Sequence, residues 1–259
     1  MISEETFDAL AEKARRRKYS SMNYVDYEDC ANAEIIHDRD DLVLLLDRSK
    51  TPAMLYFGAD DFAALVKIIA GLPGKLRVHF VPRAFAARLE EIGFAEWGEY
   101  ADFFNDALAD TAARLDDGGG EILYLGGDEC SFAAAVSQRC KGQSRGYEGE
   151  SAAWFAKWLE ENKVIVLRVG SAIAGFCCVS IYQEGTMLWV REVAVDPAYQ
   201  GKGLGKKLIG QAIRYGVENG AVKGFLAADI LNANAIGLYE KYGFRAKNAD
   251  RELQMIKDE

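Results

Sequence analysis

Histidine, proline and long apolar runs are scarce in this sequence of 259 residues. There are two histidines and four prolines, and no segment reaches the ~18 consecutive apolar residues of a membrane-spanning helix. The first 18 residues, MISEETFDALAEKARRRK, are polar and amphipathic, so we expect no secretory signal peptide there. His37 and His79 have no Cys or His partner at ligand spacing. These absences predict a protein with no membrane segment and no metal.

The cysteines form no recognisable framework, because they are odd in number and irregularly spaced. Cys177 and Cys178 are neighbours in a predicted strand and point to opposite faces, which disfavours a disulfide or a metal pair. Free thiols in a reducing cytoplasm are the favoured interpretation of the whole set. The five positions are Cys30, Cys130, Cys140, Cys177 and Cys178.

Basic charge is also limited. Residues 1–120 contain 14 Lys and Arg against 23 Asp and Glu, whereas residues 121–259 contain 17 of each, so the first half carries the whole formal charge of −9. Nucleic-acid binding depends on phosphate neutralisation, which this composition disfavours. The acidic half could attract cationic substrates, but an ordinary solubilising surface is the favoured interpretation.

The chain is long enough for about two domains of ~150 residues. The segment Asp116–Gly120, DDGGG, is the best candidate for a joint between them. We therefore expect one domain over residues 1–118 and a second over residues 119–259.

The most informative segment is Trp189–Lys207, WVREVAVDPAYQGKGLGKK. It predicts a strand, a turn containing proline, and a glycine-rich loop that opens into a helix. Free amide groups at a helix start, with no crowding Cβ atoms, suit a pyrophosphate. A Walker A loop is excluded because Gly201 and Gly205 are one residue too close, and Lys206 precedes another lysine. A dinucleotide fingerprint is excluded because its third glycine would fall on Leu208.

At this point the chain resembles the GNAT superfamily of acetyl-CoA-dependent N-acetyltransferases. Gln200, Gly203 and Gly205 match that family's Q/R-x-x-G-x-G/A motif, and Asn232–Phe244, NANAIGLYEKYGF, matches its N-x-x-A-I-x-L-Y-E-K-x-G-F segment. The resemblance covers residues ~121–259 by the count of predicted elements. It implies an α/β (α+β) fold, with a mixed, mostly antiparallel central sheet flanked by helices.

The predicted elements follow the family's order, β-α-α-β-β-β-α-β-α-β. Short strand and helix signals come first, then a hairpin around Gly170–Ser171, a central strand, the loop helix, and a final strand–helix–strand series. The expected ranges are 121–125, 131–140, 151–161, 163–169, 172–182, 186–195, 203–218, 222–230 and 233–241, with one or two closing strands after Phe244.

The first half contains an apparent degenerate copy of the second. Arg88–Phe94, RLEEIGF, precedes Leu238–Phe244, LYEKYGF, by 150 positions, and a predicted strand, Lys75–Val81, comes before it. Upstream, Pro52–Gly58 and Asp61–Gly71 predict a strand and a helix without the glycine motif. Asp60 and Asp61 would repel a pyrophosphate there, so we expect no acetyl-CoA binding by this copy.

The resemblance implies a site for acetyl-CoA as cosubstrate. The central strand would separate from its neighbour and pair with pantetheine through Val193 and Val195, and the Val193 amide would stabilise the oxyanion. The loop would hold the pyrophosphate, and Asn232 would contact CoA near its helix start; Lys202, Lys206 and Lys207 could instead be ordinary solvated lysines. The expected cofactor-binding residues are Val193, Ala194, Val195, Gln200, Gly201, Lys202, Gly203, Leu204, Gly205, Lys206, Asn232 and Tyr239.

Two residues are candidates for proton transfer. Tyr239 matches the family tyrosine that protonates the leaving thiolate, although it could be a core aromatic instead. Glu192 lies on the central strand where several family members place a base. Strand alternation would place it on the face opposite Arg191 and Val193, where it could instead pair with a cation.

The sequence therefore predicts acetyl transfer to a primary amine of a small molecule or peptide, by direct attack in a ternary complex. Direct attack is favoured because no cysteine falls at a position that the motifs mark as catalytic. A catalytically silent acyl-CoA-binding or partner-binding protein and a transferase of longer acyl chains stay open as alternatives. The protein could be a monomer or a homodimer.

Overall fold

The computed structural model describes residues 1–23, 25–115, 121–247 and 251–258. Contacts divide the chain into two compact units, Met1–Tyr100 with Asp250–Glu259, and Ala101–Ala249. The expected joint, residues 116–120, lies outside the described residues. Unit 1 and unit 2 therefore meet along the chain at residue 100 and again at residue 249, and the end of the chain belongs to unit 1.

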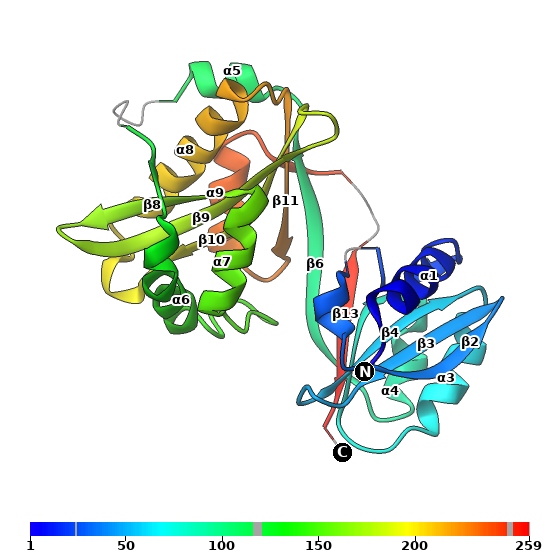
Figure 1. Ribbon diagram of the computed structural model, residues 1–259. Coiled ribbons are helices and arrows are strands. Elements are labelled where there is room, and N and C mark those ends of the chain that lie inside the picture. The colour runs from blue at the N-terminus through cyan, green and yellow to red at the C-terminus, as the bar shows by residue number, and fades with distance from the viewer. Residues whose placement is uncertain (24, 116–120, 248–250, 259) are drawn as a thin grey trace. The chain divides into compact units, whose positions relative to one another are not determined.

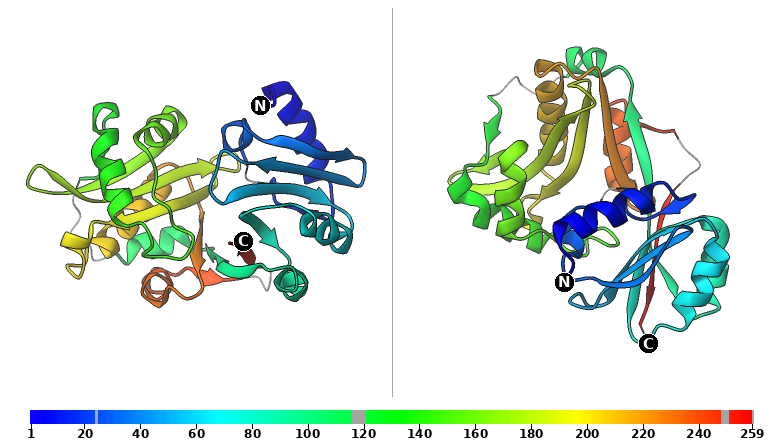
Figure 2. Two further views of the ribbon diagram at one scale, coloured as in Figure 1. Left: turned by 90° about the horizontal axis from the view of Figure 1, so that it is seen from below. Right: turned by 45° about the vertical axis from the view of Figure 1, so that its right-hand side comes forward.

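Unit 1 is a mixed sheet with helices on both faces (Figures 1 and 2). Its strand order is β2-β3-β4-β5-β13-β6, with β1 paired to β4; β4 and β5 are parallel, and the other strand pairs described in this unit are antiparallel. The elements are α1 (Glu4–Arg15), β1 (Tyr19–Ser20), α2 (Tyr27–Cys30), β2 (Glu34–Arg39), β3 (Leu42–Asp47), β4 (Ala53–Ala59), α3 (Phe62–Ala70), β5 (Leu76–Val81), η1 (Arg83–Phe85), α4 (Ala86–Glu90), β6 (Ala95–Asn105) and β13 (Glu252–Lys257).

Unit 2 has the same kind of sheet, in the order β6-β11-β10-β9-β8-β7, with β12 paired to the last residues of β6. Strands β10 and β11 are parallel. The elements are α5 (Leu108–Ala113), β7 (Leu123–Tyr124), η2 (Gly127–Glu129), α6 (Cys130–Arg139), α7 (Ala152–Glu161), β8 (Lys163–Val169), β9 (Ala172–Tyr182), β10 (Met187–Val195), η3 (Pro197–Tyr199), α8 (Leu204–Glu218), β11 (Lys223–Asp229), α9 (Ala233–Lys241) and β12 (Arg245–Ala246).

Each sheet buries apolar side chains on both faces, since strand residues alternate between two cores. In unit 2, Val164 and Phe176 face α6 and α7, whereas Ile165 and Cys177 face α8. In unit 1, α1 covers one face, and α3 and α4 cover the other. The expected mixed sheet flanked by helices is confirmed, together with the order of elements in residues 121–246.

The two units repeat one series of elements. Three antiparallel strands, a helix, a parallel strand, a second helix and a closing strand occur as β2 to β6 and again as β8 to β12. The second helix ends alike in both: the Phe94 amide donates to the Leu89 carbonyl at 3.0 Å, and the Phe244 amide to the Tyr239 carbonyl at 3.1 Å. The preceding glycines, Gly93 and Gly243, both have positive φ. The repeat inferred from RLEEIGF and LYEKYGF is thus a repeat of topology.

The closing strands differ from the expectation. Only β12 stays in unit 2, while β13 pairs with β5 and β6 in unit 1. Sequence periodicity identifies a strand, but backbone hydrogen bonds to distant residues decide which sheet it joins.

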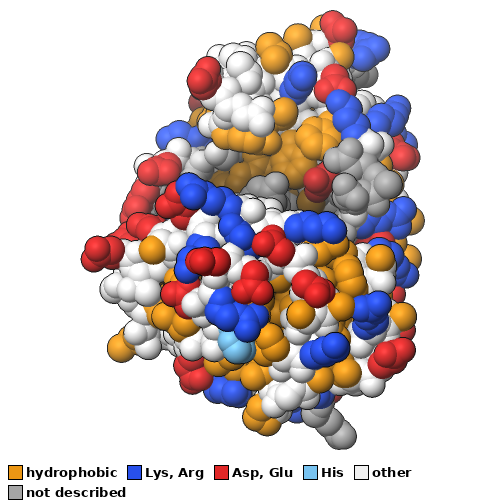
Figure 3. All heavy atoms as spheres, turned by 90° about the vertical axis from the view of Figure 1, so that its right-hand side faces the viewer, with side chains coloured by type: hydrophobic (Ala, Val, Ile, Leu, Met, Phe, Trp, Pro, Cys, Tyr) orange, Lys and Arg blue, Asp and Glu red, His pale blue; other side chains and the backbone are white. Residues whose placement is uncertain are grey.

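Surface charge is mixed on the face shown in Figure 3, where acidic and basic side chains are interspersed with apolar ones. The formal charge of −9 therefore forms no single acidic field on that face. No helix among the described residues is long and apolar enough to cross a membrane.

Candidate active site

The glycine-rich loop forms an anion-binding turn at the start of α8. Gly201 and Gly203 have φ of 76° and 80°, and Gly203 is the N-cap, so no side chain caps the helix. The first amide that is hydrogen-bonded to a backbone carbonyl belongs to Lys207, which donates to Gly203 at 3.2 Å. Among the described residues, the amides of 201–206 have no partner. Six consecutive free amides at the positive end of a helix dipole favour a phosphate.

The equivalent helix of unit 1 is closed by its own side chain. Asp61 caps α3 and accepts hydrogen bonds from the amides of Ala63 at 2.9 Å and Ala64 at 3.1 Å. Asp60 is held by the Lys18 amide and by Arg17. An anion at this helix start would therefore have to displace a carboxylate.

Strands β10 and β11 pair only over a short stretch. The parallel register joins residues 187–189 to 223–225 and ends there, whereas β10 continues to Val195 along β9. Within the part of the chain that the structure describes, residues 190–195 of β10 thus have a ladder on the β9 side alone. The Val195 carbonyl accepts from Gln200 Nε2 at 2.9 Å and Cys140 Sγ at 3.3 Å, so a pantetheine amide would have to share it.

In unit 1 the same opening is filled by the chain itself. β4 and β5 pair over residues 53–55 and 76–78, and beyond them β1 pairs with Gly58 and Ala59. β3 occupies the opposite edge of β4 over residues 54–59. A strand of the protein therefore lies where unit 2 has an open edge.

A β-bulge at Arg191 changes the directions of the side chains on β10. Val190 lies opposite Val179 and Glu192 opposite Cys178, which leaves Arg191 unpaired between them. Arg191 lies against Trp154 and Trp158 of α7, and Glu192 contacts Ser137 of α6, while Val193 packs with the α8 core. The expectation that Glu192 and Arg191 project from opposite faces of the sheet is wrong, because the extra residue interrupts the alternation. Glu192 and Val193 do project from opposite faces, as expected.

Glu192 is buried and held by hydroxyl groups. Its Oε1 accepts hydrogen bonds from Ser137 Oγ at 3.2 Å and from the Tyr147 hydroxyl, and its Oε2 lies 3.8 Å from Arg191 Nη1. Burial raises the pKa of Glu192 and the nearby Glu150 adds to the rise, whereas Tyr147, Arg191 and Ser137 oppose it. A carboxylate with a raised pKa can accept a proton near neutral pH.

An aromatic cluster borders Glu192 on the α7 side. The rings of Trp154 and Trp158 stack with centroids 5.4 Å apart, and Trp189 meets Trp158 edge to face. The Arg191 guanidinium lies 4.3 Å from the Trp154 ring centroid and 3.2 Å from Glu150. The cluster thus holds the positive charge of the Arg191 guanidinium next to the candidate base.

Tyr239 projects from α9 into the core that α8 covers. The ring is half-buried and meets Phe244 with centroids 6.5 Å apart. Burial raises the pKa of its phenol, with a smaller contribution from Cys177, so the group stays protonated at neutral pH. Its hydroxyl forms no hydrogen bond within the described residues, which leaves the proton available to a ligand.

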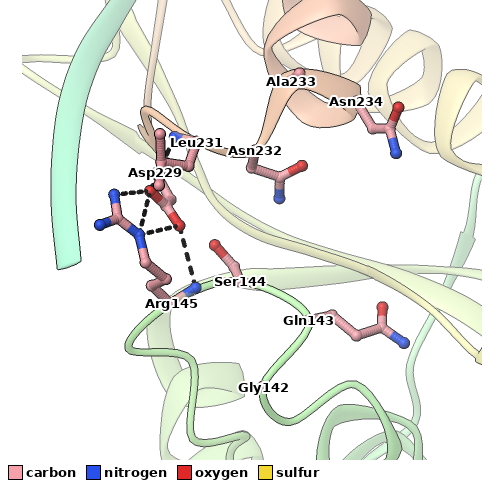
Figure 4. Close-up of a pocket in the computed structure, with 9 residues that line it drawn as sticks. All are labelled: Gly142, Gln143, Ser144, Arg145, Asp229, Leu231, Asn232, Ala233 and Asn234. Atoms are coloured by element: carbon pink, nitrogen blue, oxygen red, sulfur yellow. Dashed lines mark hydrogen bonds and ion pairs between the residues drawn. The ribbon is translucent and has the colours of Figure 1, made fainter. Parts of the chain in front are cut away.

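A pocket of about 390 Å³ lies between the loop after α6 and the start of α9 (Figure 4). Asn232 lines it and also caps α9 through the Ala235 amide at 3.1 Å. Its other lining residues are Gly142, Gln143, Ser144, Arg145, Asp229, Leu231, Ala233 and Asn234. Gln143 connects the pocket to the anion loop, since Gln200 Nε2 lies 2.7 Å from its Oε1.

The wall of this pocket contains an ion pair that the sequence did not indicate. Arg145 reaches Asp229 with Nη2 at 2.6 Å and Nε at 3.1 Å, as Figure 4 shows. Burial alone would raise the pKa of Asp229, but hydrogen bonds from Arg145 and from the Leu231 amide outweigh it and lower the pKa. No local motif marks Asp229, because its partner is 84 positions away.

The loop lysines lie at the start of α8, and the cysteines are buried elsewhere in the two units. Lys202 lies 5.3 Å from the Tyr199 ring centroid, and Lys206 and Lys207 lie in the first turn of α8. All five cysteines are buried free thiols. Within the described ranges, no group of three or more His, Cys, Asp or Glu side chains could hold a metal.

Comparisons with known proteins agree with this geometry. A Methanocaldococcus jannaschii protein named as an uncharacterized N-acetyltransferase is 30% identical over 115 residues, which are 41% of this chain and 51% of that protein. The mycothiol acetyltransferase of Corynebacterium efficiens is 34% identical over 89 residues, 34% of this chain and 30% of that enzyme. The chain thus spans about half of the length of the first of these curated relatives and less than a third of the second.

One solved structure is similar over both units. It is a tandem GNAT protein from the clavulanic acid biosynthesis pathway, with a TM-score of 0.55 and 16% identity, covering 83% of this chain and 77% of that one. This likeness concerns the fold. Residues 133–244 match the model of the acetyltransferase (GNAT) family. The chain therefore contains a GNAT-family acetyltransferase domain, which lies within unit 2.

Proposed function

We propose that unit 2 transfers an acetyl group from acetyl-CoA to a primary amine in a ternary complex. The observation that carries the proposal is the run of six free amides at residues 201–206, next to a strand pair that separates after Trp189. The first feature suits the pyrophosphate, and the second offers a free strand edge to the amides of pantetheine.

Different parts of acetyl-CoA are bound by the glycine-rich loop, by the backbone of β10 and by Asn232. Loop amides from Gly201 to Lys206 hold the pyrophosphate, and Lys202, Lys206 and Lys207 add positive charge. The backbone of Val193, Ala194 and Val195 pairs with the pantetheine arm, and Asn232 donates through its amide. Gln200 fixes the loop against β10.

The chemistry uses groups on three elements. Glu192 takes a proton from the acceptor ammonium through a water, and the neutral nitrogen attacks the thioester carbon. The Val193 amide donates to the oxyanion as the C–N bond forms. The C–S bond then breaks, and Tyr239 gives its proton to the leaving thiolate. The nitrogen, which still carries one proton more than the product amide, returns that proton through water to the Tyr239 phenolate.

The acceptor is a primary amine of a small molecule or a peptide. The loop at residues 140–149 brings Tyr147 to the candidate base and also lines the pocket next to Asn232, and Arg191 lies beside Glu192. These groups would therefore contact the acceptor. One relative is named for a small molecule, mycothiol. A panel of small amines is therefore the first set to test.

Unit 1 does not bind acetyl-CoA in this proposal. β1 fills its strand opening, and Asp61 occupies its helix start. One molecule of acetyl-CoA per chain is the expected stoichiometry.

Calorimetric titration with acetyl-CoA tests the proposal. One site per chain, followed by amine-dependent CoA release, supports it. Binding without release across the amine panel would indicate a silent acyl-CoA-binding protein. Tighter binding and faster turnover of longer acyl-CoAs would show that the transferred group is a longer acyl chain and not acetyl. An isolable acetyl-enzyme would contradict direct attack in a ternary complex.

The first prediction concerns Tyr239. Tyr239→Phe should lower kcat about 100-fold or more with little change in acetyl-CoA affinity, because only the proton donor is lost. Steady-state kinetics and calorimetry on the same preparation measure both quantities. Tyr124→Phe is the control, since Tyr124 is exposed on β7. An unchanged kcat would remove Tyr239 from catalysis.

Compartment and assembly are also proposals. Five free thiols suit the reducing cytoplasm. A monomer or a homodimer is expected, and sedimentation velocity distinguishes the two.

A further inference from the structure

The candidate base is held by a hydroxyl network that comes from outside its own strand. Ser137 Oγ lies 2.6 Å from the Tyr147 hydroxyl, and both groups contact Glu192 Oε1. The Glu150 amide donates to Ser137 Oγ at 2.7 Å. Ser137 and Tyr147 are thus fixed from α6 and from the loop that follows it.

The protons of this network can be assigned from its contacts. Ser137 Oγ already accepts from the Glu150 amide, so its own proton is available to Glu192 or to Tyr147. The Tyr147 proton goes to Glu192 Oε1. Oε1 thus has two donors close by, whereas Arg191 Nη1 is 3.8 Å from Oε2, beyond hydrogen-bond distance.

We propose that Tyr147 and Ser137 are positioning residues, which hold Glu192 Oε1 and leave Oε2 to receive the proton of the acceptor ammonium. This inference rests on the proposed function of Glu192 as the base. Two neutral donors stabilise the carboxylate form without adding a charge that would repel the ammonium. The bulge at Arg191 is what turns Glu192 toward this network.

Other charged and titratable groups around Glu192 also affect its pKa. The loop adds the carboxylate of Glu150, and β10 adds the guanidinium of Arg191. The thiols of Cys140 at the end of α6 and of Cys178 on β9 lie on the same side of the sheet as Glu192, and that of Cys177 lies on the other face. Burial raises the pKa of all three, which keeps them neutral. Among the described residues, the groups that interact with Glu192 are Ser137, Cys140, Tyr147, Glu150, Cys177, Cys178 and Arg191.

The test is the pH dependence of kcat/KM in Tyr147→Phe. Loss of a donor to the carboxylate should raise the pKa of Glu192, so the acidic limb should move to higher pH by about one unit or more. At pH above the shifted limb, the rate should recover toward that of the wild type. Glu192→Gln should remove the limb altogether. Tyr215→Phe on α8 is the matched control and should leave the profile unchanged.

A second measurement does not depend on turnover. The Glu192 carboxyl is titrated by ¹³C NMR of glutamate-labelled protein, with Glu192→Gln to assign the signal. A raised pKa in Tyr147→Phe, but not in Tyr215→Phe, supports the network. An unchanged pKa, or a lower rate with an unshifted limb, would overturn it. If the pKa of Glu192 rises in Tyr147→Phe but Glu192→Gln leaves kcat/KM unchanged, the hydroxyl network is supported and Glu192 is rejected as the base.

Discussion

At the scale of single residues, the two helix starts differ in which atom faces the amides. Asp61 places a carboxylate on the amides of α3, whereas Gly203 has no side chain and leaves those of α8 free. The same helix dipole is therefore satisfied internally in unit 1 and available to a ligand in unit 2. Gly203 is also at a positive φ of 80°, which L side chains rarely adopt.

Gly203→Val should weaken acetyl-CoA binding and destabilise the fold by about 1–3 kcal/mol through backbone strain. A Cβ there meets no protein atom within 4 Å, so it would project into the space left for the phosphate. Gly185→Val is the matched control, because Gly185 has φ of 86° and an equally open surrounding. Thermal unfolding and calorimetry should show a similar loss of stability in both variants, with affinity lost in Gly203→Val alone. Equal affinities would mean that the loop is misassigned.

At the scale of elements, β10 provides the candidate base and the strand edge of the proposed site. Its short pairing with β11 exposes a backbone edge, and its bulge brings Arg191 and Glu192 to one face. The sequence located the strand and the candidate base but not the bulge, because alternation of residues is the only orientation that a local pattern encodes. Ser137 and Tyr147 lie 55 and 45 positions from Glu192, so nothing local connected them to it.

The fit of α8 on the sheet of unit 2 depends on a glycine. A Cβ at Gly216 would lie 3.0 Å from Leu108 and 3.0 Å from Leu188. Gly216→Val should therefore cost about 1–3 kcal/mol of the free energy of unfolding, measured in urea. The contrasting variant is Gly237→Ala in α9, where no atom lies within 4 Å and helix propensity should add about 0.5–1 kcal/mol. Equal stability of the two variants would contradict the close packing of α8.

At the scale of the whole molecule, unit 1 is formed by both ends of the chain, and unit 2 by the segment between them. β6 pairs with β13 in unit 1 through residues 95–100 and with β12 in unit 2 through residues 103–104. The end of the chain returns to unit 1 as β13, between β5 and β6. The sheet of unit 1 is thus built from two separate pieces of sequence, whereas unit 2 is one continuous segment, Ala101–Ala249.

Deleting residues 251–259 should consequently disrupt unit 1 rather than the transferase unit. β5 and residues 95–100 of β6 would lose their partner strand, whereas β8 to β11 would keep theirs. Hydrogen exchange should show lost amide protection at residues 76–81 and 95–100. Deletion of residues 258–259 alone is the control, as these follow β13. Loss of amide protection confined to β10 and β11 would contradict the pairing of β13 with β5 and β6.

The sequence by itself determined what depends on neighbouring residues: the strand, loop and helix of the anion site, the order of elements and the repeated G-F helix ends. These follow from local sterics, because glycine permits positive φ and apolar spacing selects a helix or a strand. Only the tertiary structure decided the place of β13, the filling of the opening in unit 1 by β1, the bulge at Arg191 and the Tyr147–Glu192 contact. Each of them joins segments far apart in the chain, where packing and backbone pairing determine the partner.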